Sequence, residues 1–376
     1  MSDTLQQINQ ALQHKITAEI KHSGRISFAR FMNMALYEPG LGYYSAGLHK
    51  LGKEGDFITA SGLGTLFAQT NARVFAPLLA ALKQPRIMEL GAGTGAFCCD
   101  VLQELNSLGQ LPAQYVIVEV SADLKQVQKQ QVSQLGPELQ ALVVWQDAPP
   151  AEPFEGLVFA NEVIDALPVE VFKYEDSCFQ RLMLTSKQGQ LEECWEAFPT
   201  AMEEQLMQMN LGLSDGYRSE FLPNLSAWLD SVTNSLTRGW AFFIDYGYGR
   251  PHHYHPQRNT GTLVCQRRHQ ANFNPYQDIG LQDITAFVDF TAVAEGLQHA
   301  GFSIDGFSTQ GDFLVNAGIQ DFLDPNADYR EYYQLVAEMK QLVLPEEMGE
   351  KFKVMVASKN TDTPVSGLLH NRWQDL

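Results

Sequence analysis

The sequence has few cysteines, few basic residues and no long apolar run, and each shortage excludes a class of protein. Its five cysteines include no Cys-x-x-Cys pair, so neither a zinc site nor a disulfide framework is indicated, and a reducing compartment is expected. Lys and Arg number 26 against 44 Asp and Glu, and the resulting net charge of −18 argues against a nucleic-acid binder. No apolar run reaches the roughly 18 residues of a transmembrane helix, so no membrane insertion is predicted.

The acidic composition suits a basic protein as partner, although the same charge also keeps a protein in solution. Apolar residues between Leu5 and Ile20 recur at helical spacing and predict an amphipathic helix. Residues 1–22 contain no arginine and no apolar block, unlike a transit peptide or a secretory signal. We therefore expect a cytoplasmic location. The sequence leaves the oligomeric state open, a homodimer included.

The most informative stretch is a glycine-rich turn that follows a short apolar strand at 86–90. Gly91, Gly93 and Gly95 stand at alternate positions and a helical pattern follows, so a strand, a tight turn and a helix are expected. Glycine suits such a turn because it adopts positive φ and leaves room for a ligand against the backbone. The turn is predicted to hold a nucleotide-like cofactor. The alternative is an ordinary strand-helix turn in which glycine serves only packing.

Glu89 distinguishes between the cofactors that fit this turn. Gly91, Gly93 and Ala96 also satisfy the fingerprint of dinucleotide-binding proteins. A pyrophosphate would meet the negative charge of Glu89, whereas S-adenosylmethionine has no phosphate and carries an ammonium and a sulfonium. We therefore predict S-adenosylmethionine as the cofactor, with an NAD-dependent dehydrogenase as the alternative.

Polar residues also follow the next three predicted strands, where the ligand crevice of an open α/β sheet lies. Glu119 is near the end of the strand 115–120, and an acid there accepts hydrogen bonds from ribose hydroxyls in either cofactor. Gln146 and Asp147 are candidates for the adenine amine, although a solvated loop explains them nearly as well. The predicted cofactor-binding residues are Glu89, Gly91, Gly93, Gly95, Glu119, Gln146, Asp147 and Asn161.

Two loops are further candidates for the site. The loop 249–280 holds three histidines between 252 and 255, but no acid or cysteine lies at matching ligand spacing. We predict no metal there and favour a polar active-site loop. The glycine-rich segment 52–65 is a candidate lid.

The order of apolar strands and helical patterns predicts an α/β fold with a Rossmann-like, seven-stranded sheet, an N-terminal helical extension and helical insertions. Four regions are expected: an N-terminal helical and lid region at 1–85, a cofactor-binding half at 86–168, an inserted substrate-side module at 169–238, and a second half of the sheet at 239–376 with a helical insertion near 310–350. The module is predicted to contain a hairpin followed by a mostly helical stretch.

Several strings resemble one family over nearly the whole chain. The most specific are Asn-Glu-Val-Ile-Asp-Ala-Leu-Pro-Val from Asn161 and Leu-Pro-Glu-Glu-Met-Gly-Glu-Lys-Phe-Lys-Val from Leu344. A third is Leu-Tyr-Glu-Pro-Gly-Leu-Gly-Tyr-Tyr from Leu36. The sequence is similar to the MidA-type class I methyltransferases, relatives of the mitochondrial respiratory complex I assembly methyltransferase. It departs from the family pattern after Thr59, where the family resembles Ala-Pro-Glu and this chain reads Ala-Ser-Gly.

The resemblance implies a Rossmann-like sheet that binds S-adenosylmethionine and, in the mitochondrial relatives, symmetric dimethylation of an arginine on a complex I subunit. A basic protein is then the expected acceptor. Two alternatives stay open: an assembly chaperone that binds S-adenosylmethionine without essential catalysis, and a small-molecule methyltransferase.

Three carboxylates are the candidates for catalysis. Glu162 and Asp165 leave the sheet after the strand 157–160, and Asp245 ends the strand 240–245. An arginine side chain is fully protonated at neutral pH, so carboxylates would bind its guanidinium, localise the charge and allow a proton to leave. Glu162 is the preferred bidentate partner. For Asp165 a helix cap is about as good an explanation as catalysis.

Overall fold

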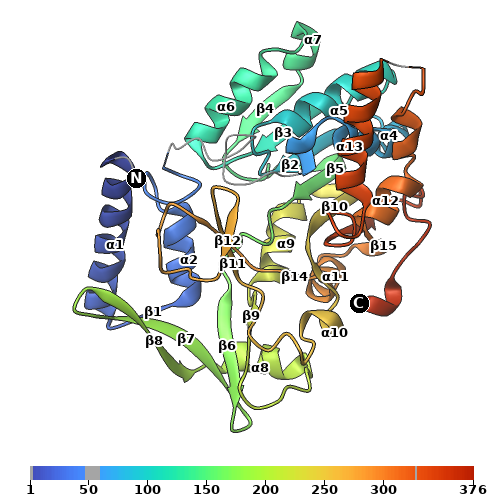
Figure 1. Cartoon of the computed structure of the whole chain (residues 1–376). Helices are drawn as coiled ribbons and strands as arrows, with labels where there is room; N and C mark the ends of the chain where they lie inside the picture. Colours follow the sequence, from blue (N-terminus) through green and yellow to red (C-terminus); the bar gives the residue numbers. More distant parts are fainter. Residues whose placement is uncertain (1–2, 47–59, 327) are drawn as a thin grey trace.

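The structure is a computed structural model that describes residues 3–46, 60–326 and 328–376. A large sheet forms its centre (Figure 1). The strands of this sheet are β2 (Arg86–Leu90), β3 (Gln114–Val118), β4 (Val143–Gln146), β5 (Phe154–Asn161), β10 (Leu236–Tyr248), β14 (Val288–Asp289), β15 (Ser303–Thr309) and β16 (Phe352–Lys359). Their order is β15-β16-β10-β5-β2-β3-β4, and β14 pairs with the end of β10.

Five of these strands, β4, β3, β2, β5 and β10, run parallel, whereas β16 lies antiparallel between β10 and β15. The predicted α/β fold with a Rossmann-like sheet is confirmed. Within the described residues the sheet has eight strands, one more than the sequence predicts, because the two-residue β14 joins it. The parallel strands bring their carboxyl ends to one edge, where a ligand crevice is expected.

Helices cover both faces of the large sheet (Figure 1). Buried side chains of both faces alternate along β5, where Phe159 stacks on Phe97 at 4.2 Å between ring centroids while Val158 packs on the opposite side. This two-sided burial explains why the strands are continuous apolar runs. The helices whose side chains join the core of one face include α4 (Leu66–Ala80), α5 (Ala96–Ser107), α6 (Ala122–Val132), α7 (Pro137–Gln140), α12 (Gln310–Asn316), η1 (Ile319–Phe322) and α13 (Tyr329–Val343). Those of the other face include α9 (Leu225–Thr233) and α11 (Phe290–His299).

A second group of elements packs around its own core beside the large sheet. It contains two helices and two antiparallel sheets. The helices are α1 (Asp3–Ser23) and α2 (Phe28–Tyr37). One sheet has β1 (Ile26–Ser27), β6 (Glu170–Glu175), β7 (Cys178–Lys187), β8 (Gln190–Ala197) and β9 (Tyr217–Phe221), and the other has β11 (Val264–Arg267), β12 (Gln270–Asn272) and β13 (Asp283–Thr285).

The region 169–238 contains the predicted hairpin, formed by β6 and β7, but the mostly helical stretch after it was a wrong prediction. β8 and β9 are strands of the same sheet, and only the short α8 (Thr200–Gln208) and α9 are helical there. The segment of β8 carries Glu192, Glu193 and Glu196, whose spacing would also suit the exposed face of a helix. Pairing with β7 makes it a strand, in which Glu196 faces Arg181 and forms an ion pair at 2.6 Å.

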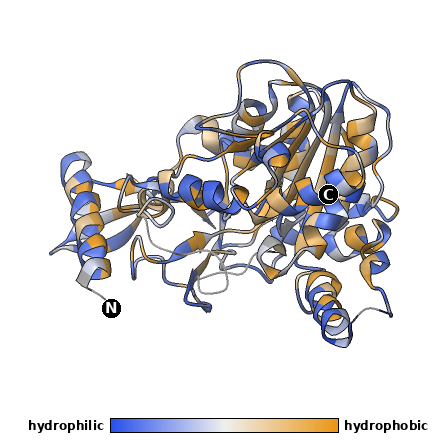
Figure 2. Ribbon diagram, turned by 90° about the horizontal axis from the view of Figure 1, so that it is seen from above, coloured by the Kyte–Doolittle hydropathy of each residue, from blue (hydrophilic) through white to orange (hydrophobic). Residues whose placement is uncertain are grey.

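The amphipathic helix predicted near the N-terminus is confirmed as α1, which buries Leu12, Ile16 and Ile20. Figure 2 shows hydrophobic residues along the strands of the large sheet and both kinds of residue on the helix beside the N-terminus. No helix among the described residues has the length and apolarity needed to span a bilayer. The remaining elements are α3 (Ala60–Leu63), α10 (Arg250–His253) and η2 (Trp373–Asp375).

Candidate functional site

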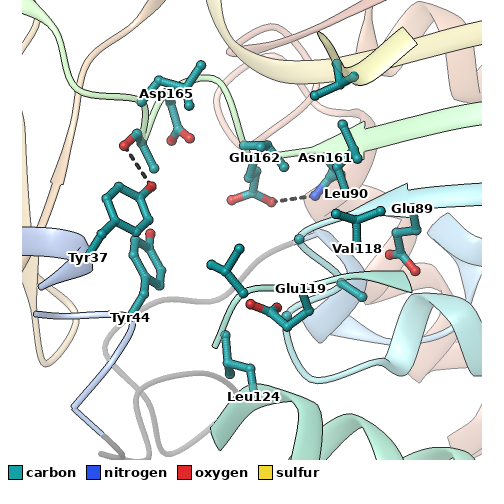
Figure 3. Close-up of a pocket in the computed structure, with 18 of the residues that line it drawn as sticks. Tyr37, Tyr44, Glu89, Leu90, Val118, Glu119, Leu124, Asn161, Glu162 and Asp165 are labelled. Carbon is teal, nitrogen blue, oxygen red and sulfur yellow. Dashed lines mark hydrogen bonds between the residues drawn. The ribbon is translucent and has the colours of Figure 1, made fainter. Parts of the chain in front are cut away.

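A cavity of about 490 Å³ opens at the carboxyl ends of β2, β3 and β5. One side is formed by the strand ends and the glycine-rich turn, and the other by α2, the turn that follows it, and β13 (Figure 3). The predicted residues that line it are Glu89, Gly91, Gly93, Glu119, Asp147, Asn161, Glu162 and Asp165. Gly95, Gln146 and Asp245 are not among the lining residues.

The glycine-rich turn has the backbone geometry that its sequence suggests. Gly91, Gly93 and Gly95 all have positive φ, at 64°, 54° and 84°. A Cβ on Gly91 would lie 3.3 Å from Val163, so the turn passes closely under the segment that follows β5. Gly91 and Gly93 face the cavity, whereas Gly95 begins α5. The first two glycines therefore leave room for a ligand, and the third starts the helix.

Glu89 is buried at the end of β2 and lines the cavity. The hydroxyl of Tyr115 donates to its Oε2 at 2.8 Å. Burial raises the pKa of Glu89 to about 8, and the bond from Tyr115 opposes this rise. A positive charge placed nearby would offset the burial and ionise the carboxyl group.

Glu119 is held by a residue that the sequence analysis missed. Its Oε1 accepts from the backbone N–H of Ser121 at 2.8 Å, and its Oε2 accepts from Gln128 Nε2 at 3.0 Å. The fully buried Gln128 also donates to the carbonyl of Gly93 at 3.0 Å and accepts from Trp145 Nε1 at 3.1 Å. One amide thereby ties together the glycine turn, the end of β3 and β4. Gln128 is one of four glutamines in the polar helix α6, so the sequence gives no signal that singles it out for this role.

Gln146 is the last residue of β4 and Asp147 follows it, but only one of the two side chains lines the cavity. Asp147 is exposed, lines the cavity and forms an ion pair with Lys125, which lowers its pKa. Gln146 contributes its backbone carbonyl, which accepts from the N–H of Glu119 at 3.0 Å. The structure thus places Asp147, and not Gln146, at the cavity.

Glu162 lies at the centre of the cavity wall (Figure 3). Its φ is 55°, a conformation that residues other than glycine rarely adopt. Oε1 accepts from Asn161 Nδ2 at 3.0 Å and from the backbone N–H of Ala60 at 3.4 Å. Oε2 is buried and has no hydrogen-bond partner among the described residues. Burial, and then the nearby Asp245, raise the pKa of Glu162 to about 8.

Asp245 is almost completely buried and accepts hydrogen bonds from the backbone that follows β5. Its Oδ2 accepts from the N–H groups of Val163, Ile164 and Asp165 at 3.2, 2.9 and 3.2 Å, and its Oδ1 accepts from the N–H of Tyr246 at 2.8 Å. Burial raises its pKa to about 7, against these four bonds. Asp245 therefore fixes the turn that carries the cavity-lining Glu162 and Asp165.

Asp165 is buried and lines the cavity beside the tyrosines of α2 and its following turn (Figure 3). Burial, together with Asp245 and Asp283, raises the pKa of Asp165 well above its usual range. No helix begins at this position within the described ranges, so the helix-cap alternative is wrong.

The other side of the cavity carries residues that the sequence analysis did not select. The rings of Tyr37 and Tyr44 stack with centroids 5.5 Å apart and an interplanar angle of 21°. Tyr37 donates to the carbonyl of Ala166 at 2.9 Å, and Tyr44 donates to the carboxylate of Asp283 at 2.9 and 3.0 Å. Tyr37 and Tyr44 belong to the string from Leu36 that resembles the family, but no role was predicted for either.

The charged side chains of the cavity are all of one sign. Six carboxylates line it: Glu89, Glu119, Asp147, Glu162, Asp165 and Asp283. None of the described lining residues is Lys or Arg. Burial of carboxylates without cations is costly, which is why the pKa values of Glu89, Glu162 and Asp165 are raised. The cavity is thus suited to ligands that bring positive charge.

The histidines of the loop 249–280 do not line this cavity, so the interpretation of an active-site loop is wrong for them. His253 is buried against Tyr254, and burial lowers its pKa to about 3. From the loop 249–280, Gln266 alone lines the cavity among the described residues. The described part of the chain holds no group of three His, Cys, Asp or Glu side chains that could bind a metal ion. Most of the candidate lid, residues 52–59, lies outside the described residues.

The chain is similar to known methyltransferases in sequence and in structure. The family described as "Putative S-adenosyl-L-methionine-dependent methyltransferase" matches residues 70–308. A Burkholderia thailandensis protein bound to S-adenosyl-homocysteine has a similar structure, with a TM-score of 0.93, 38% identity, and coverage of 99% of this chain and 97% of that protein.

Curated relatives include the mitochondrial protein arginine methyltransferase NDUFAF7 of Danio rerio, which is 27% identical over 92% of this chain and 86% of the relative. The Homo sapiens protein of the same name is 25% identical over 89% of this chain and 80% of the relative. These two matches cover a larger share of the chain than the residues 70–308 of the family match.

Proposed function

Since this chain belongs to the family of S-adenosyl-L-methionine-dependent methyltransferases, we propose that its methyl acceptor is an arginine side chain of a protein. S-adenosylmethionine is the cofactor. Support for an arginine comes from the relatives named protein arginine methyltransferase, at about 26% identity. The acidic whole-chain charge further supports a basic protein as substrate.

The single observation that carries this proposal is the arrangement around Glu162. A buried carboxylate oxygen with no described partner faces a cavity whose charged lining side chains are all acidic. An unpaired buried acceptor is costly unless a ligand supplies a donor. A guanidinium supplies five N–H donors in a planar fork and a permanent positive charge, which satisfies both requirements.

The residues at the strand ends fit the cofactor. Gly91 and Gly93 leave open backbone beside the cavity, Glu119 is held ready to accept from ribose hydroxyls, and Asp147 is an exposed acceptor at the end of β4. We assign Glu89 to the positively charged part of the cofactor. Bound S-adenosylmethionine supplies an electrophilic methyl group at this end of the cavity.

Glu162 then binds the guanidinium and helps a proton to leave it. Its pKa near 8 makes its carboxylate a stronger base than an ordinary glutamate. Asp165 adds a second carboxyl group to the same side of the cavity, and Asp245 holds the backbone that positions both. The acceptor nitrogen is thereby oriented and its positive charge is drawn toward the carboxylates. Its lone pair would then attack the methyl carbon as the bond to sulfur breaks, and Glu162 would accept the proton that the nitrogen loses.

Methylation of short basic peptides tests the proposal. We expect the wild-type protein to transfer labelled methyl groups to peptides that contain arginine, with the product identified by mass spectrometry. Glu162→Gln keeps the shape of the side chain but removes its charge, so transfer should fall by at least about 100-fold. Calorimetric titration with S-adenosyl-homocysteine should show affinity within a few-fold of the wild type.

Two results would contradict this assignment. If Glu162→Gln lost cofactor affinity and methyl transfer to the same extent, Glu162 would not be a residue that binds the acceptor. Full complementation of a gene knockout by Glu162→Gln would favour an assembly chaperone that binds S-adenosylmethionine without needing catalysis.

A further inference from the structure

The side of the cavity that faces the cofactor residues has the features of a second binding surface. Tyr37 and Tyr44 present half-buried rings there, and Asp283 and Thr285 come from β13 (Figure 3 shows the two tyrosines). The stacked rings provide a flat aromatic face, and the carboxylate lies at the hydroxyl edge of one ring.

The turn after α2 is built to bring Tyr44 onto Tyr37. The N–H groups of Tyr43 and Tyr44 donate back to the carbonyls of Ala35 and Leu36 at 2.9 and 2.8 Å. Gly42 permits this reversal, because a Cβ there would lie 2.7 Å from the carbonyl oxygen of Leu36. These contacts fix the backbone at Tyr44, whose ring stacks on that of Tyr37.

Tyr44 also fixes Asp283. Its hydroxyl lies within hydrogen-bond distance of both carboxylate oxygens, and the N–H of Ile284 donates to Oδ1 at 2.9 Å. Asp283 contributes to the raised pKa values of both Glu162 and Asp165, so these carboxylates act electrostatically on the same volume.

We propose that Tyr37, Tyr44 and Asp283 form the subsite that selects a planar guanidinium over a lysine ammonium. This inference rests on the proposed function. The tyrosine rings contact the face of the guanidinium, while Asp283 and Glu162 bind N–H groups at its edge. A guanidinium stacks on aromatic rings and donates within one plane, whereas an ammonium is a compact and strongly hydrated charge. Asp283 contacts the acceptor, and Tyr44 is the residue that positions Asp283.

Two isosteric variants test the subsite. Tyr44→Phe keeps the ring and removes the bond to Asp283, and Asp283→Asn removes the charge. Each should raise KM for an arginine peptide about tenfold while kcat changes less than about threefold. The preference for arginine over lysine, measured as the ratio of kcat/KM for two otherwise identical peptides, should fall in parallel. The double variant should be no worse than Asp283→Asn alone, because the two residues act as one unit.

Tyr276→Phe is the matched control. It removes a similar tyrosine hydroxyl bond, to Glu193 at 2.7 Å, at a position outside the cavity. This variant should keep the KM and the arginine preference of the wild type. Each variant should bind S-adenosyl-homocysteine with an affinity within twofold of the wild type. That result would show that the variant is folded and that its cofactor-binding residues are intact.

The outcomes separate this inference from the function on which it rests. If the wild type methylates arginine peptides but both variants keep its KM and its arginine preference, the subsite is wrong and the proposed function stands. If the wild type methylates no arginine acceptor, the proposed function is wrong and the subsite is overturned with it.

Discussion

At the scale of single residues, the site depends on carboxyl groups whose pKa values are raised. Burial without cations raises the pKa of Glu162 to about 8, and one of its oxygens has no described partner. The cationic acceptor that we propose would bind the ionised form of this group. Binding of the acceptor must therefore release a proton at pH values below about 8.

This linkage predicts the pH dependence of the reaction. Below pH 8 the free protein holds Glu162 protonated, so kcat/KM for an arginine peptide should rise with pH by up to tenfold per unit and level off near pH 8 to 9. The apparent pKa belongs to the carboxylates together, because Asp165 and Asp245 titrate in the same environment. Initial rates between pH 6 and 9.5, with a peptide whose only ionisable side chain is arginine, provide the measurement. A flat profile would show that Glu162 is already ionised in the free protein.

The residues near the strand ends were predictable because each lies at or near the end of an apolar run in the sequence. Glu89, Glu119 and Glu162 were found in this way, and all three line the cavity. Asp245 satisfies the same rule, yet its oxygens are used by backbone N–H groups that the sequence does not reveal. Tyr44 and Asp283 are far apart in the chain and meet only through tertiary packing, so no local pattern could have joined them.

At the scale of elements, the cofactor end of the cavity depends on how the glycine turn, β3 and β4 are held together. Gln128 of α6 makes this connection through Gly93, Glu119 and Trp145. Its amide is fully buried, so each lost bond leaves a buried group without a partner.

Gln128→Leu should therefore weaken cofactor binding without touching the acceptor side. We expect about tenfold lower affinity for S-adenosyl-homocysteine, because Glu119 and the turn lose a fixed partner and become less ordered. The control is Gln130→Leu, an exposed position on the same helix, which should bind as the wild type does. Calorimetry on both variants gives the comparison, and equal affinity in the two would mean that Gln128 does not support the cofactor site.

At the scale of the whole molecule, the acidic net charge would favour the basic substrate that we propose. The net charge is −18 and the cavity adds a local concentration of carboxylates. Such a field increases the encounter rate with a cationic substrate and is screened by salt over roughly 10 Å at 0.1 M.

We expect kcat/KM for a peptide with several basic residues to fall at least several-fold between roughly 0.02 and 0.5 M salt. S-adenosyl-homocysteine carries no net charge at neutral pH, so its affinity should change by less than twofold over the same range. The comparison of the two salt dependences is the measurement. If kcat/KM for the basic peptide did not change with salt, the acidic charge of the protein would not contribute to substrate binding.

The cofactor residues and the tyrosines stand on elements that pack into different hydrophobic cores. Glu89, Gly91 and Glu119 sit at the end of the large sheet, whereas α2 packs with α1 and the antiparallel strands. Substitutions within the smaller core can reshape the acceptor side while the cofactor side stays as it is. Evolution can then exchange one methyl acceptor for another without rebuilding the machinery that supplies the methyl group.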